Sequence, residues 1–184
     1  MSRLFKAIGL MSGTSLDGVD GALLTTDGEM VAEPGLALTF PYGAETRAKL
    51  HAALVAARSL TRGLPVPPEI DAAERVLTEA HVDLVAHLLA QAQLEPSDVD
   101  YIGFHGQTVL HRPEKKLTVQ IGDAPALAKL IHVPVMYDFR AADVDAVERS
   151  PAHETDHFEE PGHRVKQPLF RGWFQRRTSK VSRR

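Results

Sequence analysis

Residues 12–20 bring together several groups that could bind a phosphate. The segment Ser-Gly-Thr-Ser-Leu-Asp-Gly-Val-Asp places three hydroxyls and two carboxylates around two glycines. Apolar runs flank it on both sides, and Asp17-Gly18 is a pair that favours a hairpin turn with positive φ. Such a loop can direct backbone N–H groups and hydroxyls at one anion, for example a nucleotide phosphate. A hairpin that only joins two strands remains the alternative, because no lysine-containing phosphate-binding motif is present.

A second group of polar residues, His-Gly-Gln-Thr-Val at 105–109, follows a short apolar segment at 101–104. Side chains directly after a strand are the usual site residues of an α/β sheet. A single histidine in that position is nevertheless more often structural. On these residues alone, both interpretations stay open.

The hydrophobic periodicity predicts the elements that would position these groups. Strands are expected at 4–11, 19–26 and 29–41, followed by amphipathic helices at 44–60 and 69–93. His81 and His87 of the second helix are expected at the surface. Further strands at 101–104, 117–121 and 133–137 enclose a short helix at 124–131, for which Asp123 is the predicted N-cap. This order predicts an α/β fold with a mixed sheet and a parallel helix-to-strand connection.

Composition narrows the functional classes. The 184 residues are 43% hydrophobic, carry a net charge of −3 and include no cysteine. One domain with a sizeable core is expected, without disulfides or thiolate metal sites. No signal peptide or membrane span is evident in the sequence, so a cytoplasmic location is expected.

The last forty residues differ in character from the rest. Residues 161–184 contain eight Lys or Arg and no Asp or Glu, with aromatic residues interleaved. Non-specific nucleic-acid binding is one interpretation of this basic tail. His153, Glu154 and His157 form a His-Glu-x-x-His pattern, with His163 beyond, which makes a zinc metalloprotease the other alternative. Prolines on both sides argue against an active-site helix, and residues 146–184 are predicted to be disordered.

Four motifs together resemble one family. They are Met-Ser-Gly-Thr-Ser-Leu-Asp-Gly-Val-Asp at 11–20, Gly-Phe-His-Gly-Gln-Thr-Val at 103–109, Thr-Val-Gln-Ile-Gly-Asp at 118–123 and Asp-Phe-Arg at 138–140. In this order they resemble the anhydro-N-acetylmuramic acid kinases. The resemblance implies the ribonuclease-H-like half of the actin, sugar-kinase and heat-shock ATPase superfamily. Residues 1–145 would form this half, and residues 146–184 an aberrant tail.

The resemblance also implies site residues. The hairpin would lie under the nucleotide phosphates. The nucleotide-binding residues would then be Gly13, Thr14, Ser15, Leu16, Asp17, Gly18, Val19 and Asp20. Hydroxyls of Ser12, Thr14 and Ser15 would donate to phosphate, and Asp17 and Asp20 would act through the metal or the loop shape. Residues close to the substrate would be His105, Gln107, Asp123, Asp138 and Arg140.

By this resemblance the activity is phosphoryl transfer from ATP, with Mg²⁺, to 1,6-anhydro-N-acetylmuramic acid. Water opens the anhydro bridge to give N-acetylmuramic acid 6-phosphate, a step in cell-wall sugar recycling. The family's catalytic aspartate lies in an Asp-Thr-Gly-Pro-Gly-Asn motif, which this chain lacks. The family pattern is expected to end near Asp145, and the second domain is absent, so this chain is predicted to be inactive alone. Whether the full-length family forms a homodimer stays an open question.

Overall fold

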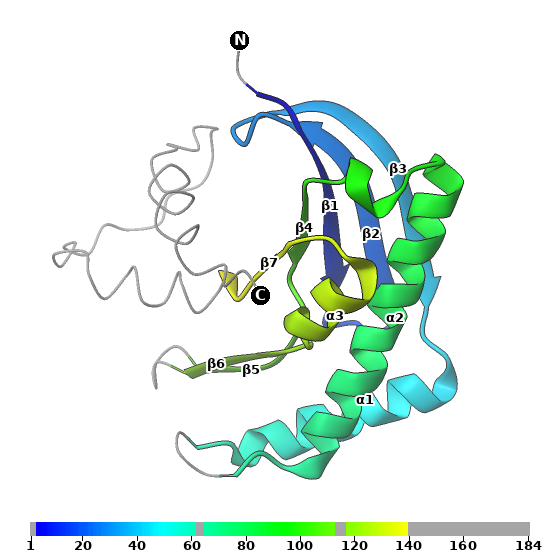
Figure 1. The fold of residues 1–184 in the computed structure, drawn as a ribbon. Helices are drawn as coiled ribbons and strands as arrows, with labels where there is room; N and C mark the ends of the chain where they lie inside the picture. Colours follow the sequence, from blue (N-terminus) through cyan, green and yellow to red (C-terminus); the bar gives the residue numbers. More distant parts are fainter. Residues whose placement is uncertain (1–2, 62–64, 113–116, 140–184) are drawn as a thin grey trace, which may run out of the picture.

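The structure is a computed structural model that describes residues 3–61, 65–112 and 117–139. It contains a five-stranded sheet covered on one face by helices, and a separate two-stranded sheet (Figure 1). The elements, in chain order, are β1 (Phe5–Ser12), β2 (Gly18–Thr26), β3 (Val31–Pro41), α1 (Ala44–Ala56), η1 (Ala57–Ser59), α2 (Pro68–Ala92), η2 (Pro96–Asp98), β4 (Tyr101–Phe104), β5 (Gln107–Arg112), β6 (Leu117–Ile121), α3 (Ala124–Ile131) and β7 (Val135–Tyr137).

The large sheet has the strand order β3-β2-β1-β4-β7. Its first three strands form an antiparallel meander, because short turns connect them. β4 and β7 run parallel to β1, since helices provide the longer connections that parallel pairing needs. The α/β fold with a mixed sheet, predicted from the sequence, is confirmed.

The core lies between the sheet and α2, the long helix that crosses it (Figure 1). Leu77, Leu84 and Leu88 recur on one stripe of α2 and are fully buried. Each buried side chain of this kind contributes about 1.5–3 kcal/mol. Gly21 of β2 leaves room for Leu84, because a Cβ at that position would collide with the Leu84 side chain.

The prediction that His81 lies at the surface is wrong. Its side chain is fully buried, and its ring meets the Phe104 ring edge to face at a centroid distance of 4.9 Å. His81 follows Leu77 by four residues and precedes Leu84 by three, so it shares their stripe. His87 is exposed, as predicted.

The sequence predicts only one strand of the two-stranded sheet. β6 is present as expected, whereas β5, which contains Gln107, occupies a segment that the sequence indicates only as a motif after a strand. The two strands pair antiparallel, with Gln107 opposite Ile121. The β5–β6 pair therefore begins close to the carboxyl end of β4. In the described part of the chain, no helix is long and apolar enough to cross a membrane.

Candidate functional site

The hairpin between β1 and β2 is present where the sequence predicts it, but its geometry differs at one residue. The expectation that Asp17-Gly18 supplies the positive φ is wrong, because Leu16 carries it, with φ 55°. The Leu16 amide bonds the Gly13 carbonyl at 3.2 Å, and its side chain is buried. Burial of this side chain in the core offsets the cost of the left-handed backbone.

Gly18 is required for close packing rather than for a turn. A Cβ at this position would meet the carbonyl oxygen of Phe40 on the neighbouring strand. Gly13 has no such constraint, since its Cβ would lie 3.4 Å from the Ser15 hydroxyl, an ordinary contact. The two glycines of the loop therefore have different roles, and Gly13 is the one whose lack of a side chain the fold does not demand.

The tip of the hairpin presents polar groups to solvent. Thr14, Ser15 and Asp17 are all exposed. The Ser15 hydroxyl donates to Asp17 Oδ1 at 2.7 Å, and this bond lowers the pKa of Asp17 below its usual value. The tip thus combines a carboxylate that resists protonation with hydroxyls that can reorient towards a ligand.

Three other members of the predicted site have their side chains engaged within the protein. Val19 is fully buried, and Asp20 Oδ1 accepts a hydrogen bond from the Thr39 hydroxyl at 2.6 Å. The Ser12 hydroxyl is buried and donates to Gln107 Oε1 at 2.6 Å. In this arrangement Ser12 has no hydrogen left for a phosphate, which contradicts its predicted role as a donor.

This buried bond belongs to a short chain that fastens the hairpin to the next motif. Because Ser12 gives its hydrogen to Gln107, the Tyr42 hydroxyl must donate to Ser12 Oγ, at 2.7 Å. Burial raises the pKa of Tyr42 to about 12, so the phenol keeps its proton. The amide of His105 also bonds the Leu10 carbonyl at 3.2 Å. The structure therefore holds the hairpin and the 105–109 motif together, although they lie far apart in the sequence.

A cavity of about 280 Å³ opens where β4 and β7 end. Of the residues predicted to lie near the substrate, His105 and Asp138 line it. Gln107 is buried against Ser12 instead. Gln120, which the sequence interpretation did not single out, lines the same cavity and bonds His105. The alternation of residues 117–121 could have indicated which β6 side chains share a face, but not that one meets His105.

The cavity wall includes three residues with left-handed backbone. Gly106 and Gly122 have φ of 66° and 135°, and Asp138 has φ of 64°. A Cβ on Gly106 would meet the Ile121 carbonyl, and one on Gly122 would meet the Phe104 ring. The segments around Gly106 and Gly122 therefore pack closely against their neighbours, and only glycine fits at these two positions. Of the three, Asp138 is the residue for which this backbone is costly, and such strain clusters at ligand sites, where the surrounding structure maintains it.

Two remaining predicted residues have other positions. Asp123 is the N-cap of α3, as predicted, and its Oδ1 accepts the Ala126 amide at 2.8 Å. It does not line the cavity. Arg140 lies outside the described residues, as does the whole predicted tail, including the His-Glu-x-x-His segment and the basic residues.

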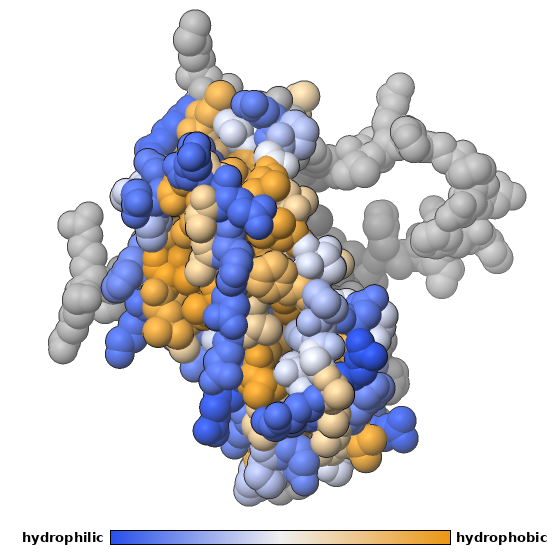
Figure 2. All heavy atoms as spheres, turned by 90° about the vertical axis from the view of Figure 1, so that its right-hand side faces the viewer, coloured by the Kyte–Doolittle hydropathy of each residue, from blue (hydrophilic) through white to orange (hydrophobic). Residues whose placement is uncertain are grey.

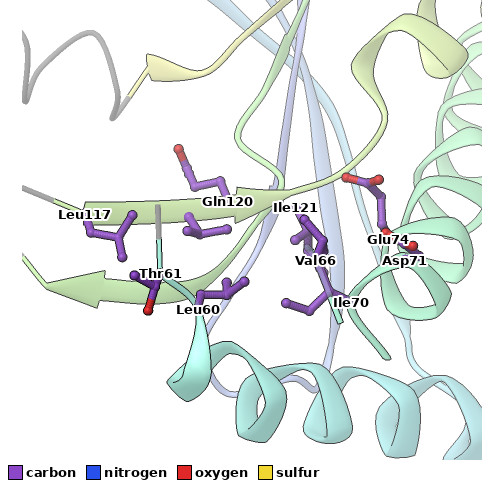
Figure 3. A pocket seen from close by; sticks show the side chains of 10 residues that line it. Leu60, Thr61, Val66, Ile70, Asp71, Glu74, Leu117, Gln120 and Ile121 are labelled. Carbon is purple, nitrogen blue, oxygen red and sulfur yellow. The ribbon is translucent and has the colours of Figure 1, made fainter. Parts of the chain in front are cut away.

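A second cavity, of about 320 Å³, has a different chemical character (Figure 3). Leu60, Val66 and Ile70 form an apolar wall below β6, and the Gln120 side chain points to the other side of that strand. Glu74 stands at one end, where its Oε1 accepts the Gly122 amide at 2.9 Å. Thr61, Asp71, Glu74 and Gln120 add polar groups to the rest of the lining.

No cluster of three or more potential metal ligands occurs within 3–61, 65–112 and 117–139. Magnesium does not require one, because it is commonly held by one or two carboxylates together with substrate phosphates. The exposed Asp17 and the nearby Asp20 could provide such carboxylates. The hairpin therefore fits a magnesium–nucleotide complex.

Comparison with known proteins gives one consistent result. The anhydro-N-acetylmuramic acid kinase family matches residues 5–149, slightly beyond the end expected near Asp145. A curated protein of that name from Bradyrhizobium diazoefficiens is 57% identical over 143 residues, which cover 78% of this chain and 39% of that protein. Another, from Rhodopseudomonas palustris, is 58% identical over 140 residues, 76% of this chain and 38% of that protein.

A more distant relative of the same name, from Agrobacterium fabrum, is 46% identical over 144 residues, 78% of this chain and 39% of that protein. The chain thus spans about two fifths of the length of the curated relatives it matches. The match covers the hairpin and the cavity described above. This chain belongs to the anhydro-N-acetylmuramic acid kinase family.

Proposed function

We propose that residues 5–149 are the nucleotide-phosphate half of an anhydro-N-acetylmuramic acid kinase. The observation that carries this proposal is the β1–β2 hairpin, with an exposed tip of hydroxyls and a carboxylate, fastened to a polar cavity within the matched region. Phosphoryl transfer depends on such positioning, because the protein mainly orients the phosphates, metal and nucleophile.

In this proposal the hairpin binds the phosphates of ATP. Thr14 and Ser15 donate hydrogen bonds to them, and Asp17 holds Mg²⁺ directly or through water. The exposure of Asp17 supports that role, since magnesium is commonly held by one or two carboxylates together with substrate phosphates. Leu16 and Val19 contribute by shape, because their buried side chains anchor the loop.

The cavity beside the hairpin would receive the sugar. The reaction proposed for the complete enzyme moves the γ-phosphoryl group of ATP to the anhydro sugar while water opens the 1,6-anhydro bridge. A base must orient the nucleophile in such a reaction. The Asp-Thr-Gly-Pro-Gly-Asn motif expected to supply it is missing from this sequence.

The chain alone is therefore expected not to turn over. Loss of a positioned base costs about 10²–10⁴ in rate. The test is incubation of the purified chain with ATP, Mg²⁺ and the anhydro sugar, with the Bradyrhizobium diazoefficiens relative as positive control. Turnover by the chain at about 1–100 s⁻¹, typical of kinases, would refute this expectation.

Phosphate binding by the hairpin can be measured without turnover. In ¹⁵N-labelled chain, Mg²⁺-ATP is expected to shift the backbone amide signals of Thr14 and Ser15. The signal of Gly28, which lies in the turn between β2 and β3 at the other end of β2, is the reference. Unchanged Thr14 and Ser15 signals at millimolar Mg²⁺-ATP would argue that the hairpin only joins two strands.

Location and assembly remain predictions. We propose that the protein acts in the cytoplasm, because a chain without cysteine calls for no oxidising compartment. A homodimer is a prediction for the full-length family.

A further inference from the structure

His105 and Gln120 form a hydrogen-bonded pair in the wall of the 280 Å³ cavity. Gln120 Nε2 donates to the backbone oxygen of His105 at 2.9 Å, and it lies 3.1 Å from Nε2 of the same histidine ring. The other ring nitrogen, Nδ1, lies 3.0 Å from the Gly106 carbonyl oxygen. Both imidazole nitrogens thus have partners inside the protein.

These contacts select one form of the ring. An amide nitrogen only donates, so His105 Nε2 must be the acceptor and carries no hydrogen. A carbonyl oxygen only accepts, so Nδ1 must carry the hydrogen that bonds Gly106. Turning the Gln120 amide over would bring its oxygen against the His105 carbonyl oxygen, which is unfavourable. Only the neutral ring with hydrogen on Nδ1 satisfies every contact.

The pairing leaves one acceptor without a partner. Gln120 Oε1 is shielded from water and makes no hydrogen bond within the described residues. Leaving a buried polar atom unsatisfied is costly, so such an atom is a candidate for contact with a ligand. Figure 3 shows the Gln120 side chain on the side of β6 opposite Leu60, although Gln120 also borders the 320 Å³ cavity.

The other described groups of this wall indicate what kind of ligand fits. Asp138 adds a carboxylate, which is a second acceptor, and Tyr137 adds a hydroxyl that can donate or accept. No Lys or Arg is among the described lining residues. Phosphates are acceptors, and proteins bind them with N–H donors and cations. Sugar hydroxyls both donate and accept, and an amide N–H donates, so they complement a wall that has two acceptors and a hydroxyl but no cation.

We propose that Gln120 is a positioning residue that fixes His105 in its neutral Nδ1–H form, and that the cavity they line binds donor groups of the amino sugar rather than the nucleotide phosphates. This rests on the proposed kinase function. In this arrangement His105 has no free ring nitrogen, so it shapes the wall and takes no proton from the sugar.

The first test is the ¹⁵N NMR spectrum of the His105 ring in the whole chain at neutral pH. The expected result is a protonated Nδ1 and an unprotonated Nε2. In Gln120→Glu, which keeps the size of the side chain but removes both donor hydrogens, Nε2 is expected to gain a hydrogen. An Nε2–H ring in the unmodified chain, or an unchanged ring in the variant, would overturn the positioning role.

The second test titrates the labelled chain separately with 1,6-anhydro-N-acetylmuramic acid and with Mg²⁺-ATP. The sugar is expected to shift the Gln120 side-chain amide signal, and Mg²⁺-ATP is not. Gln120→Met, which removes the acceptor, should weaken sugar binding about tenfold, the loss of one neutral hydrogen bond. Gln91→Met, an exposed position on α2, is the matched control and should change nothing.

The outcomes separate this inference from the proposed function. A Gln120 signal that ignores the sugar, or that responds to Mg²⁺-ATP, overturns the assignment of the cavity even if Thr14 and Ser15 respond to nucleotide. A Gln120 signal that responds to the sugar alone supports it, even if the hairpin proves not to bind ATP.

Discussion

At the scale of single residues, the two glycines of the hairpin allow ligand binding to be separated from folding. Gly18→Ala should destabilise the protein by about 2–4 kcal/mol, because its Cβ would collide with backbone rather than with a flexible side chain. Gly13→Ala should change stability by about 0.5 kcal/mol or less, since its Cβ finds space. Urea denaturation of both variants measures this difference.

The same Gly13→Ala change should weaken Mg²⁺-ATP binding if phosphates approach the loop backbone. Gly13→Val, the larger change, should abolish nucleotide binding in a full-length relative. Calorimetric titration of that relative with ATP is the measurement, and Gly43→Ala, where a Cβ meets nothing within 4 Å, is the control. Unchanged affinity in Gly13→Val would return the hairpin to a purely structural role.

His81 should make folding sensitive to mild acid. Burial lowers its pKa to about 4, against a usual value of 6.5. Between these values the unfolded chain binds more protons, so stability is complete above about pH 7 and falls as pH drops from 6.5 towards 4. The total loss is up to about 3 kcal/mol. The carboxylates with lowered pKa values, such as Asp17 and Asp27, lose their contributions only at lower pH.

Denaturation midpoints measured between about pH 4.5 and 7 test this prediction. His81→Leu should flatten the dependence in that range, although it also removes the bond to the Leu77 carbonyl. His51→Leu, at an exposed position of α1, should leave the dependence intact. An equal slope in His81→Leu and the unmodified chain would show that another group is responsible.

At the scale of elements, periodicity predicts most of the fold correctly, because amphipathic stripes and strand alternation are local signals. α3 and β4 have the predicted bounds. β5 is missed because its residues also form a motif, and pairing with β6 is not a local property. His81 is misplaced when its polar type is given more weight than its position between Leu77 and Leu84.

The candidate site is less predictable than the fold. Motif resemblance indicates the hairpin and His105, but the partners of each side chain depend on contacts distant in sequence. Ser12 meets Gln107 across ninety-five positions, and Gln120 meets His105 across fifteen. The spacing of residues within one segment does not predict contacts between segments. The sequence therefore could not show that the Ser12 hydroxyl donates to Gln107 rather than to a phosphate.

Asp123 illustrates how an element-scale role can be distinguished from a substrate role. As N-cap of α3 it should contribute about 1 kcal/mol, which Asp123→Ala would remove. Asp123→Asn should restore most of that stability, because an amide oxygen also caps. Thermal unfolding of the two variants is the measurement. If Asn restored stability but sugar binding stayed weak, the carboxylate would also contact the substrate.

At the scale of the whole molecule, the sheet has two unequal faces. Helices α2 and α3 cover one face (Figure 1). On the other, one row of neighbouring residues crosses all five strands, formed by Ala37, Ala22, Gly9, Gly103 and Met136. Apolar surface is also visible elsewhere, since Figure 2 shows hydrophobic areas on both sides of a hydrophilic band. Exposed patches of this kind commonly mark contact surfaces.

Four of the five residues in this row are Gly or Ala, and their small side chains would let another element approach closely; Met136, on the edge strand, is the exception. Sheets with parallel strands are usually covered on both faces. Since the chain spans only about two fifths of its relatives, we expect the remaining part of those proteins to provide the cover. Gly9 lies near the middle of the row and is exposed, and a Cβ added to it would have no atom within 4 Å. It is therefore the position at which to test for a missing partner.

Gly9→Leu should change the stability of this chain by about 0.5 kcal/mol or less, because the position is exposed and an added Cβ has no atom within 4 Å. Leucine at the corresponding position of the full-length Bradyrhizobium diazoefficiens relative should cost about 1–3 kcal/mol, since it would overpack a covered face. Urea denaturation of both proteins is the measurement, with Ala52→Leu, on the exposed side of α1, as control. Equally small effects in the two proteins would mean that the rest of the kinase does not pack on this face.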